Sequence, residues 1–394
     1  MAKLIVKDSE GMETPFLRGI LTSSLLDAGV EFNLAYDIAS KIRQLTNEKR
    51  LVTTSELVDI IINQLENNVE KEVIERFLST SKISSTIMVT RAEENPVPFS
   101  RAQHRLCIES CGLSSSDSFS VTKGIYNELL NRGCSEISSN ALGRMTYQLL
   151  LSEIGEKIAE RYLVWADYLH SGRPLLVLIG GTAGAGKSTI ATEVGHRFGI
   201  VRTQSTDMLR EVMRMMTPER LSPVLHASSY NAWKVQPDVG PDVQMTEQLL
   251  VAGYLRQAEL LSVACDAIIY RAIQEKVSLI LEGVHIHPNL LDKIPRDDSV
   301  IIAPIMISVL KAGKLKERIK GRGQEVPERR SKRYLEHFTE IWELQSFLMA
   351  EADRHQVPIV SNIDRGKTIQ EVMTTINDIL FPHFSHDLDK IFPE

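Results

Sequence analysis

Segments of strand length alternate with longer segments of helical periodicity through the second half of the chain. Five segments have the pattern of strands, most of them apolar, and they lie at 175–179, 199–207, 277–283, 300–310 and 357–361. Apolar runs with few polar positions are typical of parallel strands that helices cover on both faces. The pattern predicts an α/β domain with a five-stranded parallel sheet and helices on both faces, over residues 173–394.

The first half of the chain is mainly helical in pattern and contains an internal repeat. A short strand and a turn precede a helix that runs from Pro15 to Gly29, and the same order recurs from Pro98 to Gly112. The spacing from proline to glycine is equal in both copies. We predict two copies of one module, against the alternative of two unrelated helical segments with similar starts. The predicted modules span residues 1–82 and 83–170.

A glycine-rich turn follows the first strand of the α/β domain. Its spacing, Gly-x4-Gly-Lys-Ser, is that of a phosphate-binding P-loop, and an incidental glycine-rich turn is the alternative. Glycines let successive backbone N–H groups point at phosphates, and the following helix directs its positive end to the same place. Lys187 supplies a full charge, and the Ser188 hydroxyl can ligate Mg²⁺. We expect ATP and Mg²⁺ as cofactors, with ATP contacts from Gly181, Thr182, Ala183, Gly184, Ala185, Gly186, Lys187, Ser188 and Thr189.

Two carboxylates end the second and third predicted strands, Asp207 and Glu282. The carboxyl ends of parallel strands meet at one edge of a sheet, where ligands bind. Asp207 is expected to orient or deprotonate an acceptor hydroxyl, with capping of the next helix as the structural alternative. Glu282 is expected to hold Mg²⁺ together with Ser188.

Arginines and polar side chains near Asp207 suit an acceptor that already carries a phosphate or carboxylate. Arg210 and Arg214 are four residues apart and share a helix face, although a solvated basic face is the alternative. The segment 221–234 either binds substrate or packs its aromatic residues on the core. Further expected acceptor contacts are Ser229, Tyr230, Lys234 and His285. A metal pair of His285 with His287 is not expected, because no third ligand is in sight.

Lysine and arginine are dense in the segment 314–333, although the chain is net acidic. Such a cluster predicts a mobile lid that excludes water and neutralises a triphosphate, with a solvated helix face as the alternative. The run 317–322 is similar to the start of the adenylate-kinase lid. That resemblance implies that Arg318 lies against the adenine and that Arg322 lies on the phosphates. Arg322 is expected to be catalytic, together with Lys187 and Asp207. The resemblance also implies that Arg330 and Arg333 contribute to substrate binding from the lid. Asn362 is expected to lie at the adenine.

Composition excludes several function classes. The net charge is −6 over 394 residues, with 45 basic and 51 acidic side chains, which does not indicate a nucleic-acid partner. The longest apolar runs are too short for a membrane span and no signal-peptide pattern is present, so we expect a cytoplasmic protein without membrane contact. The four cysteines form no CxxC pair.

The repeated modules resemble the ATP-cone, a hairpin followed by a helical cluster that often senses nucleotides. The candidates for nucleotide contact in these modules are Lys7 and Arg18. Structural or dimerising use is an open alternative, which would make the protein a homo-oligomer through these modules.

The order of motifs resembles the 2-phosphoglycerate kinase family, which also places an ATP-cone before a P-loop kinase domain. The residues that carry this resemblance lie at 181–188, 205–207, 210–214, 225–233 and 281–285. It implies an ATP-dependent phosphotransferase with an alcohol acceptor, which converts 2-phosphoglycerate to 2,3-bisphosphoglycerate. The expected partner is thus a small phosphorylated metabolite. Alternatives are a kinase for an inositol phosphate or another small metabolite such as a nucleoside or sugar, and a non-catalytic ATP-sensing regulator.

Overall fold

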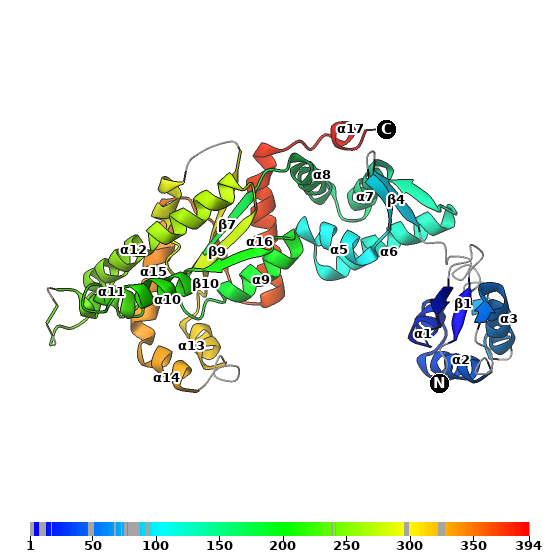
Figure 1. Cartoon of the computed structure of the whole chain (residues 1–394), viewed down its shortest axis with the longest axis horizontal. Coiled ribbons are helices and arrows are strands. Elements are labelled where there is room, and N and C mark those ends of the chain that lie inside the picture. Colours follow the sequence, from blue (N-terminus) through cyan, green and yellow to red (C-terminus); the bar gives the residue numbers. More distant parts are fainter. Residues whose placement is uncertain are drawn as a thin grey trace. The chain divides into compact units, whose positions relative to one another are not determined.

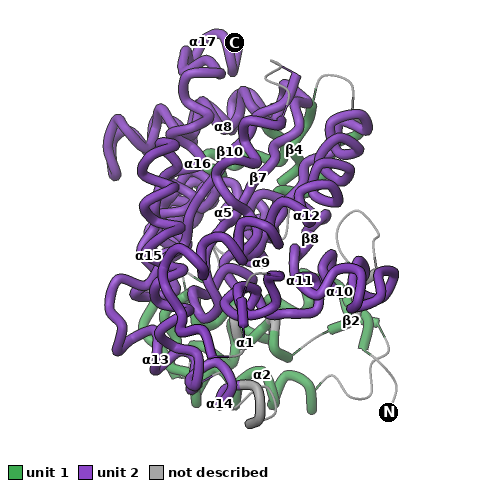
Figure 2. The backbone as a smooth tube through the Cα atoms, turned by 90° about the vertical axis from the view of Figure 1, so that its left-hand side faces the viewer, with its two compact units in different colours: residues 1–99, 129–137 green, residues 100–128, 138–394 purple. Residues whose placement is uncertain are grey.

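The computed structural model describes most of the chain, and its packing forms two compact units (Figure 2). The first unit contains residues 1–99 and 129–137, and the second contains residues 100–128 and 138–394. The described residues are 4–7, 13–16, 18–45, 51–66, 68–71, 73–74, 77, 87–91, 94–237, 239–240, 242–294, 299–321 and 328–393.

The first unit holds two small three-stranded sheets of the same strand order. In one, β1 (Ile5–Lys7) lies between β2 (Glu13–Pro15) and β3 (Leu51–Thr53). In the other, β4 (Met88–Arg91) lies between β5 (Glu94–Pro98) and β6 (Glu136–Ser138). Each begins with an antiparallel hairpin. In each, a threonine hydroxyl donates to a backbone carbonyl 47 positions away in sequence, Thr54 to Lys7 and Thr90 to Ile137.

The order of helices also repeats along the chain. Helices α1 (Arg18–Asp27) and α5 (Arg101–Ser110) begin 83 positions apart, as do α2 (Phe32–Leu45) and α6 (Ser115–Asn131). Helices α3 (Thr54–Leu65) and α7 (Ser139–Glu153) each follow a third strand directly. These parallels favour the predicted duplication, which stays a prediction.

The compact units do not follow the boundaries expected from the sequence. Helices α5, α7 and α8 (Glu156–Ser171) belong to the second unit, and their apolar side chains share one hydrophobic core with the large sheet, among them Ile108, Leu150 and Leu163. The chain also returns to this core at its end, where Phe392 stacks on Tyr162 with ring centroids 5.9 Å apart. Phe392 is buried, so the last described residues pack on this core.

Polar contacts hold α5 against a helix of the α/β fold, α9 (Lys187–Phe198). The Ser110 hydroxyl donates to the Arg197 carbonyl at 2.9 Å. Arg197 Nε lies 3.4 Å from Oε2 of the buried Glu109. The last turn of α5 is thereby fixed to the last turn of α9.

The second unit is built on a parallel sheet with the strand order β11-β10-β7-β9-β8 (Figure 1). The five-stranded parallel sheet is therefore confirmed. Its strands are β7 (Leu175–Gly180), β8 (Arg202–Ser205), β9 (Leu279–Gly283), β10 (Ile301–Ser308) and β11 (Ile359–Ser361). Because β8 and β10 lie on opposite sides of β7, the strand order reverses at β7, and such a reversal opens a crevice at the carboxyl ends of the strands.

Helices cover both faces of this sheet, as expected. Leu175, Val177 and Ile179 of β7 pack with α9 and α16 (Arg365–Leu380). The alternating residues Leu176 and Leu178 pack with α12 (Glu247–Gln274) in a separate core cluster. The other helices are α10 (Thr206–Met216), α11 (Pro223–His226), α13 (Ala312–Gly321), α14 (Glu328–Glu336), α15 (Phe338–Arg354), α17 (Leu388–Ile391), η1 (Ala232–Val235), η2 (Pro288–Lys293) and η4 (Phe381–His383). Among the described helices, none is long and apolar enough to cross a bilayer.

Pro304 lies inside β10, where a residue without an N–H group is unexpected. The N–H of Ile301 bonds to Pro174 on the β7 side, and the N–H of Met306 bonds to Pro358 on the β11 side. Even-numbered residues of β10 therefore direct their N–H toward β11. Pairing with β11 begins at Met306, two residues after Pro304, so the strand loses no hydrogen bond.

Candidate active site

The glycine-rich turn joins β7 to α9 at the carboxyl edge of the sheet. Gly181, Gly184 and Gly186 have φ angles of 140°, 85° and 91°, which favour glycine. A Cβ atom on Gly181 would lie 2.3 Å from the Ile307 carbonyl oxygen. The Nζ of the buried Lys187 donates to the Thr182 carbonyl at 2.9 Å, across the turn.

Ser188 and Glu282 are in direct contact at this edge. The Ser188 hydroxyl donates to Oε1 of Glu282 at 2.9 Å, and Glu282 is only 5% exposed. In the sheet register, Glu282 pairs with Ile179 of β7 and with Ser205 of β8. A hydroxyl and a carboxylate are ligands that Mg²⁺ prefers, and protein sites usually add substrate phosphates to one or two such ligands. No group of three or more acidic, histidine or cysteine residues could hold a metal within the described ranges.

Asp207 lies beside this pair but does not cap its helix. Ser205 is the N-cap residue of α10, because its side chain accepts the Asp207 N–H at 3.3 Å. The capping alternative for Asp207 is therefore wrong, and its exposed carboxylate lies in the first turn of α10. Since Ser205 pairs with Glu282 in the sheet, the start of α10 adjoins the end of β9.

His285 is buried behind Asp207, with both ring nitrogens engaged. Nδ1 lies 3.0 Å from the Thr206 hydroxyl and Nε2 lies 2.9 Å from Oε1 of Gln257. Burial lowers the pKa of His285 to about 4. The carboxylate of Asp207 acts against this shift in pKa, whereas Arg210 and Lys187 act with it. All three charges thus act on one imidazole. A direct contact of His285 with substrate would cost one of its two hydrogen bonds.

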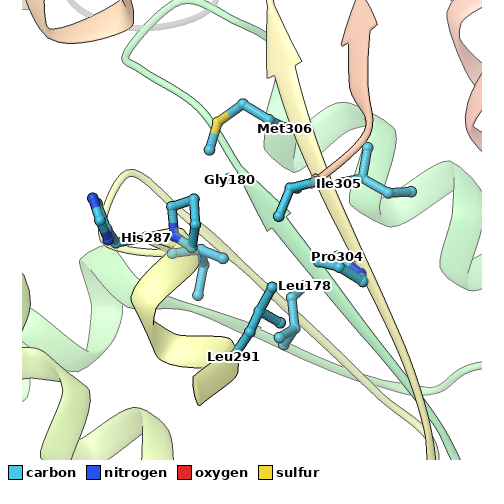
Figure 3. A pocket seen from close by; sticks show the side chains of 10 residues that line it. Leu178, Gly180, His287, Leu291, Pro304, Ile305 and Met306 are labelled. Carbon is cyan, nitrogen blue, oxygen red and sulfur yellow. The ribbon is translucent and has the colours of Figure 1, made fainter. Parts of the chain in front are cut away.

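His287 points into different surroundings. Its Nδ1 accepts the Asn289 N–H at 3.2 Å, its Nε2 lies 3.7 Å from Oε2 of Glu351, and its ring stacks on Phe347. It also borders the mostly apolar cavity in Figure 3, between β7, β10 and η2. That cavity has a volume of about 10 Å³, enough for about one water molecule. His287 thus contributes to packing.

The two arginines of α10 are engaged within the protein. Arg210 donates to the carbonyl oxygens of Leu225 and Ala227, at 3.0 and 3.1 Å. Arg210 and Arg214 both form ion pairs with Glu211, at 3.2 and 2.6 Å. An acceptor phosphate at either guanidinium would compete with Glu211.

The segment 221–234 packs its aromatic residues on the core, which was one of the two alternatives. Tyr230 is 3% exposed and packs with Leu315 and Ile319, so its ring serves packing. Ser229 is half-buried, and the exposed Lys234 places Nζ 5.4 Å from the centroid of the Trp233 ring.

A hydrogen-bonded chain links the predicted lid to the glycine-rich turn. Arg318 of α13 donates to Oδ1 of Asn362 at 2.9 Å, and Nδ2 of Asn362 donates to the Ala185 carbonyl at 2.7 Å. The two residues expected near adenine are thus in contact with each other. From α14, Arg333 donates to the Ser228 hydroxyl at 3.1 Å. Arg322 and the side chain of Arg330 lie outside the described residues.

The sequence did not lead us to predict roles for Thr206 and Gln257, whose side chains form hydrogen bonds with His285. Gln257 is fully buried on α12, at a position where the apolar stripe of Leu250, Tyr254 and Leu261 predicts an apolar side chain. A polar residue in such a stripe signals a buried hydrogen-bond network. This signal was available in the sequence.

The chain is similar in sequence to several known enzymes. No family model matches this chain. The 2-phosphoglycerate kinase of Methanopyrus kandleri is 34% identical over 285 residues, which cover 72% of this chain and 85% of that protein. The enzymes of the same name from Methanococcus vannielii and Pyrococcus furiosus are each 32% identical, over 76% and 71% of this chain and 95% and 89% of their own lengths.

The parallel sheet of this α/β fold and the sequence similarity to these enzymes together identify the protein as a kinase. More particularly, the chain belongs to the 2-phosphoglycerate kinase family.

Proposed function

We propose that this protein transfers the γ-phosphoryl group of ATP to the free hydroxyl of 2-phosphoglycerate, forming 2,3-bisphosphoglycerate and ADP. The observation that carries this proposal is the contact between Ser188 and Glu282 beside Lys187, with Asp207 in the first turn of the helix that follows the neighbouring strand. The similarity to enzymes named 2-phosphoglycerate kinase supports the choice of acceptor.

ATP would bind along the turn 181–189. The backbone N–H groups of the turn and Lys187 would hold the β- and γ-phosphates, and Lys187 would exchange its bond to the Thr182 carbonyl for phosphate oxygens. Ser188 and Glu282 fit Mg²⁺, which would neutralise charge on the bridging phosphates. Arg318 and Asn362 would lie beside the adenine, since they connect to the turn through Ala185.

Asp207 would act on the acceptor. Its carboxylate accepts the hydroxyl proton while the acceptor oxygen bonds to the γ-phosphorus. The bond from that phosphorus to the β–γ bridging oxygen breaks, and ADP leaves with the electron pair. Arg210, Arg214 and Arg333 would bind the phosphate and carboxylate already present on the acceptor, after Glu211 and Ser228 yield their contacts.

The test is product analysis with a panel of acceptors. The purified protein is incubated with ATP and Mg²⁺ plus one of 2-phosphoglycerate, 3-phosphoglycerate, glycerate or an inositol phosphate, and products are identified by mass spectrometry and ³¹P NMR. We expect ADP and bisphosphoglycerate in equal amounts with 2-phosphoglycerate alone. Turnover with a different acceptor would reassign the substrate, and ATP binding without turnover of any acceptor would indicate a regulator.

A further inference from the structure

His285 joins three parts of the site through buried hydrogen bonds. It follows β9, it contacts Thr206 at the start of α10, and it contacts Gln257 in the middle of α12. The His285 side chain is 4% exposed, and Thr206 and Gln257 are fully buried. Water therefore does not compete for these hydrogen bonds, and each buried donor needs an acceptor on the neighbouring side chain.

The bonds of Gln257 determine which nitrogen of His285 carries the proton. The amide nitrogen of Gln257 donates to the carbonyl oxygens of Val224 and Ala227, the latter at 3.1 Å. Its amide oxygen therefore faces His285 Nε2 as an acceptor, so Nε2 must carry hydrogen. Nδ1 is then an acceptor, and the Thr206 hydroxyl donates to it. Burial keeps the ring neutral, in agreement with its lowered pKa.

This chain of bonds ends next to the carboxylate that would act on the acceptor. Thr206 is the first residue of α10 and directly precedes Asp207. The fit around Thr206 is close, since a Cβ on Gly283 would lie 1.8 Å from its hydroxyl oxygen. At the other end, Gln257 and Arg210 both donate to the Ala227 carbonyl, so the segment 223–227 is held to the same chain.

We propose that His285 is a positioning residue for phosphoryl transfer: as the Nε2–H tautomer it fixes Thr206, and through Thr206 the carboxylate of Asp207, relative to the segment 223–227. This inference rests on the proposed function. His285 does not touch substrate in this role, because both of its nitrogens are bonded within the protein. Gln257 sets the tautomer, and a change at Gln257 would act through His285.

The test uses two amide variants that differ in reach. In His285→Asn, the amide can place an acceptor where Nδ1 stands and keep the Thr206 bond. In His285→Gln, the amide reaches the position of Nε2 and loses that bond. We expect kcat of His285→Asn within threefold of the wild type, kcat of His285→Gln at least tenfold lower, and KM for ATP within twofold in both.

A second pair of variants tests the same bond from the other side. Thr206→Ser keeps the hydroxyl, and its kcat should stay within threefold of the wild type. Thr206→Val should lower kcat by the same factor as His285→Gln. The double variant Thr206→Val/His285→Gln should lose no more than either single variant, since both remove one bond. Equal kcat losses in His285→Asn and His285→Gln, or additive losses in the double variant, would overturn the inference.

The tautomer is measured without any assay of turnover. Long-range ¹⁵N–¹H NMR spectra of histidine-labelled protein, assigned by the signal that disappears in His285→Asn, should show Nε2 protonated at neutral pH. A proton on Nδ1 would overturn the inference whatever the activity. Absence of turnover by the wild type would instead reject the proposed function, and with it the catalytic part of the inference.

Discussion

The hydroxyl of Ser188 lies 2.9 Å from Oε1 of Glu282 and donates a hydrogen bond to it. The two residues are 94 positions apart in the sequence. They meet because β7 and β9 are parallel neighbours in register, with Glu282 beside the last residues before the glycine-rich turn. The contact joins the helix that begins at Lys187 to a buried carboxylate.

Glu282→Gln should separate metal use from folding. The amide keeps the size and can still accept a hydrogen bond from Ser188, but it lacks the charge that would bind Mg²⁺ in the proposed function. We expect kcat to fall about 100-fold, equivalent to about 2.7 kcal/mol, and the Mg²⁺ concentration for half-maximal rate to rise. Glu371→Gln, at an exposed position of α16, is the matched control and should be silent. An unchanged Mg²⁺ dependence of Glu282→Gln would contradict the assignment.

Asp207→Asn should abolish most turnover and leave ATP binding intact. Loss of a positioned base typically costs 10²–10⁴-fold in rate, and we expect a fall in kcat of about 100-fold or more. The dissociation constant of ATP, measured by calorimetry, should stay within twofold. Asp353→Asn, an exposed residue of α15, serves as the control. A parallel loss of ATP affinity would reject the role of Asp207.

Asn362 should be sensitive both to loss of its amide and to an added negative charge. Its amide nitrogen donates to the Ala185 carbonyl, which Asn362→Asp cannot do, and a carboxylate there would repel a triphosphate. We expect KM for ATP to rise about tenfold in Asn362→Ala and further in Asn362→Asp. Equal effects of the two changes on KM would indicate that charge at this position does not act on ATP.

Two glycines with positive φ should respond differently to alanine. In Gly181→Ala the new Cβ would clash with the Ile307 carbonyl, and we expect a loss of about 3 kcal/mol or more in the free energy of unfolding. Gly199 has a φ of 65° and open space around it, so Gly199→Ala should cost only about 1 kcal/mol. Urea unfolding followed by tryptophan fluorescence reports on this unit, since Trp165, Trp233 and Trp342 all lie in it. Similar losses at both positions would contradict the packing at Gly181.

The lowered pKa values of three histidines predict that the protein becomes less stable in mild acid. Burial lowers the pKa values of His104, His285 and His287 from 6.5 to about 4. Between these values the unfolded chain binds protons that the folded chain does not, so the free energy of unfolding falls as pH drops from about 6.5 to 4. Above pH 6.5 the contribution is fully present.

Urea titrations between pH 7 and 4.5 measure this slope. His104→Gln should flatten it even if the variant is less stable at pH 7, and His383→Gln, at an exposed site, should not. An unaltered slope in His104→Gln would show that the pKa of His104 is the same in the folded and the unfolded chain.

The sheet and the glycine-rich turn could be predicted because their signals are local. An apolar run such as 175–179, followed at once by the spacing of Gly181, Gly186 and Lys187, specifies a strand, a turn and a helix without reference to the rest of the chain. The predicted ends of the strands were less accurate than their positions. The second strand stops at Ser205 rather than Asp207, because the Ser205 side chain caps the next helix.

Contacts between distant segments could not be predicted in the same way. The amphipathic pattern of α5, α7 and α8 shows that they bury one face but not which partner covers it, and their partner is the core of the large sheet. Likewise, Tyr230 and His285 carry polar groups that suit a substrate. Only the structure shows one packed beside α13 and the other bonded to Thr206 and Gln257.

The attachment of α5 to the far end of α9 has a mechanical consequence. Helix α9 is 12 residues long, about 18 Å, and it starts at Lys187. Its opposite end is anchored through Arg197 to Ser110 and Glu109. The contacts with α5 and the glycine-rich turn therefore lie at opposite ends of one continuous helix, with no loop between them.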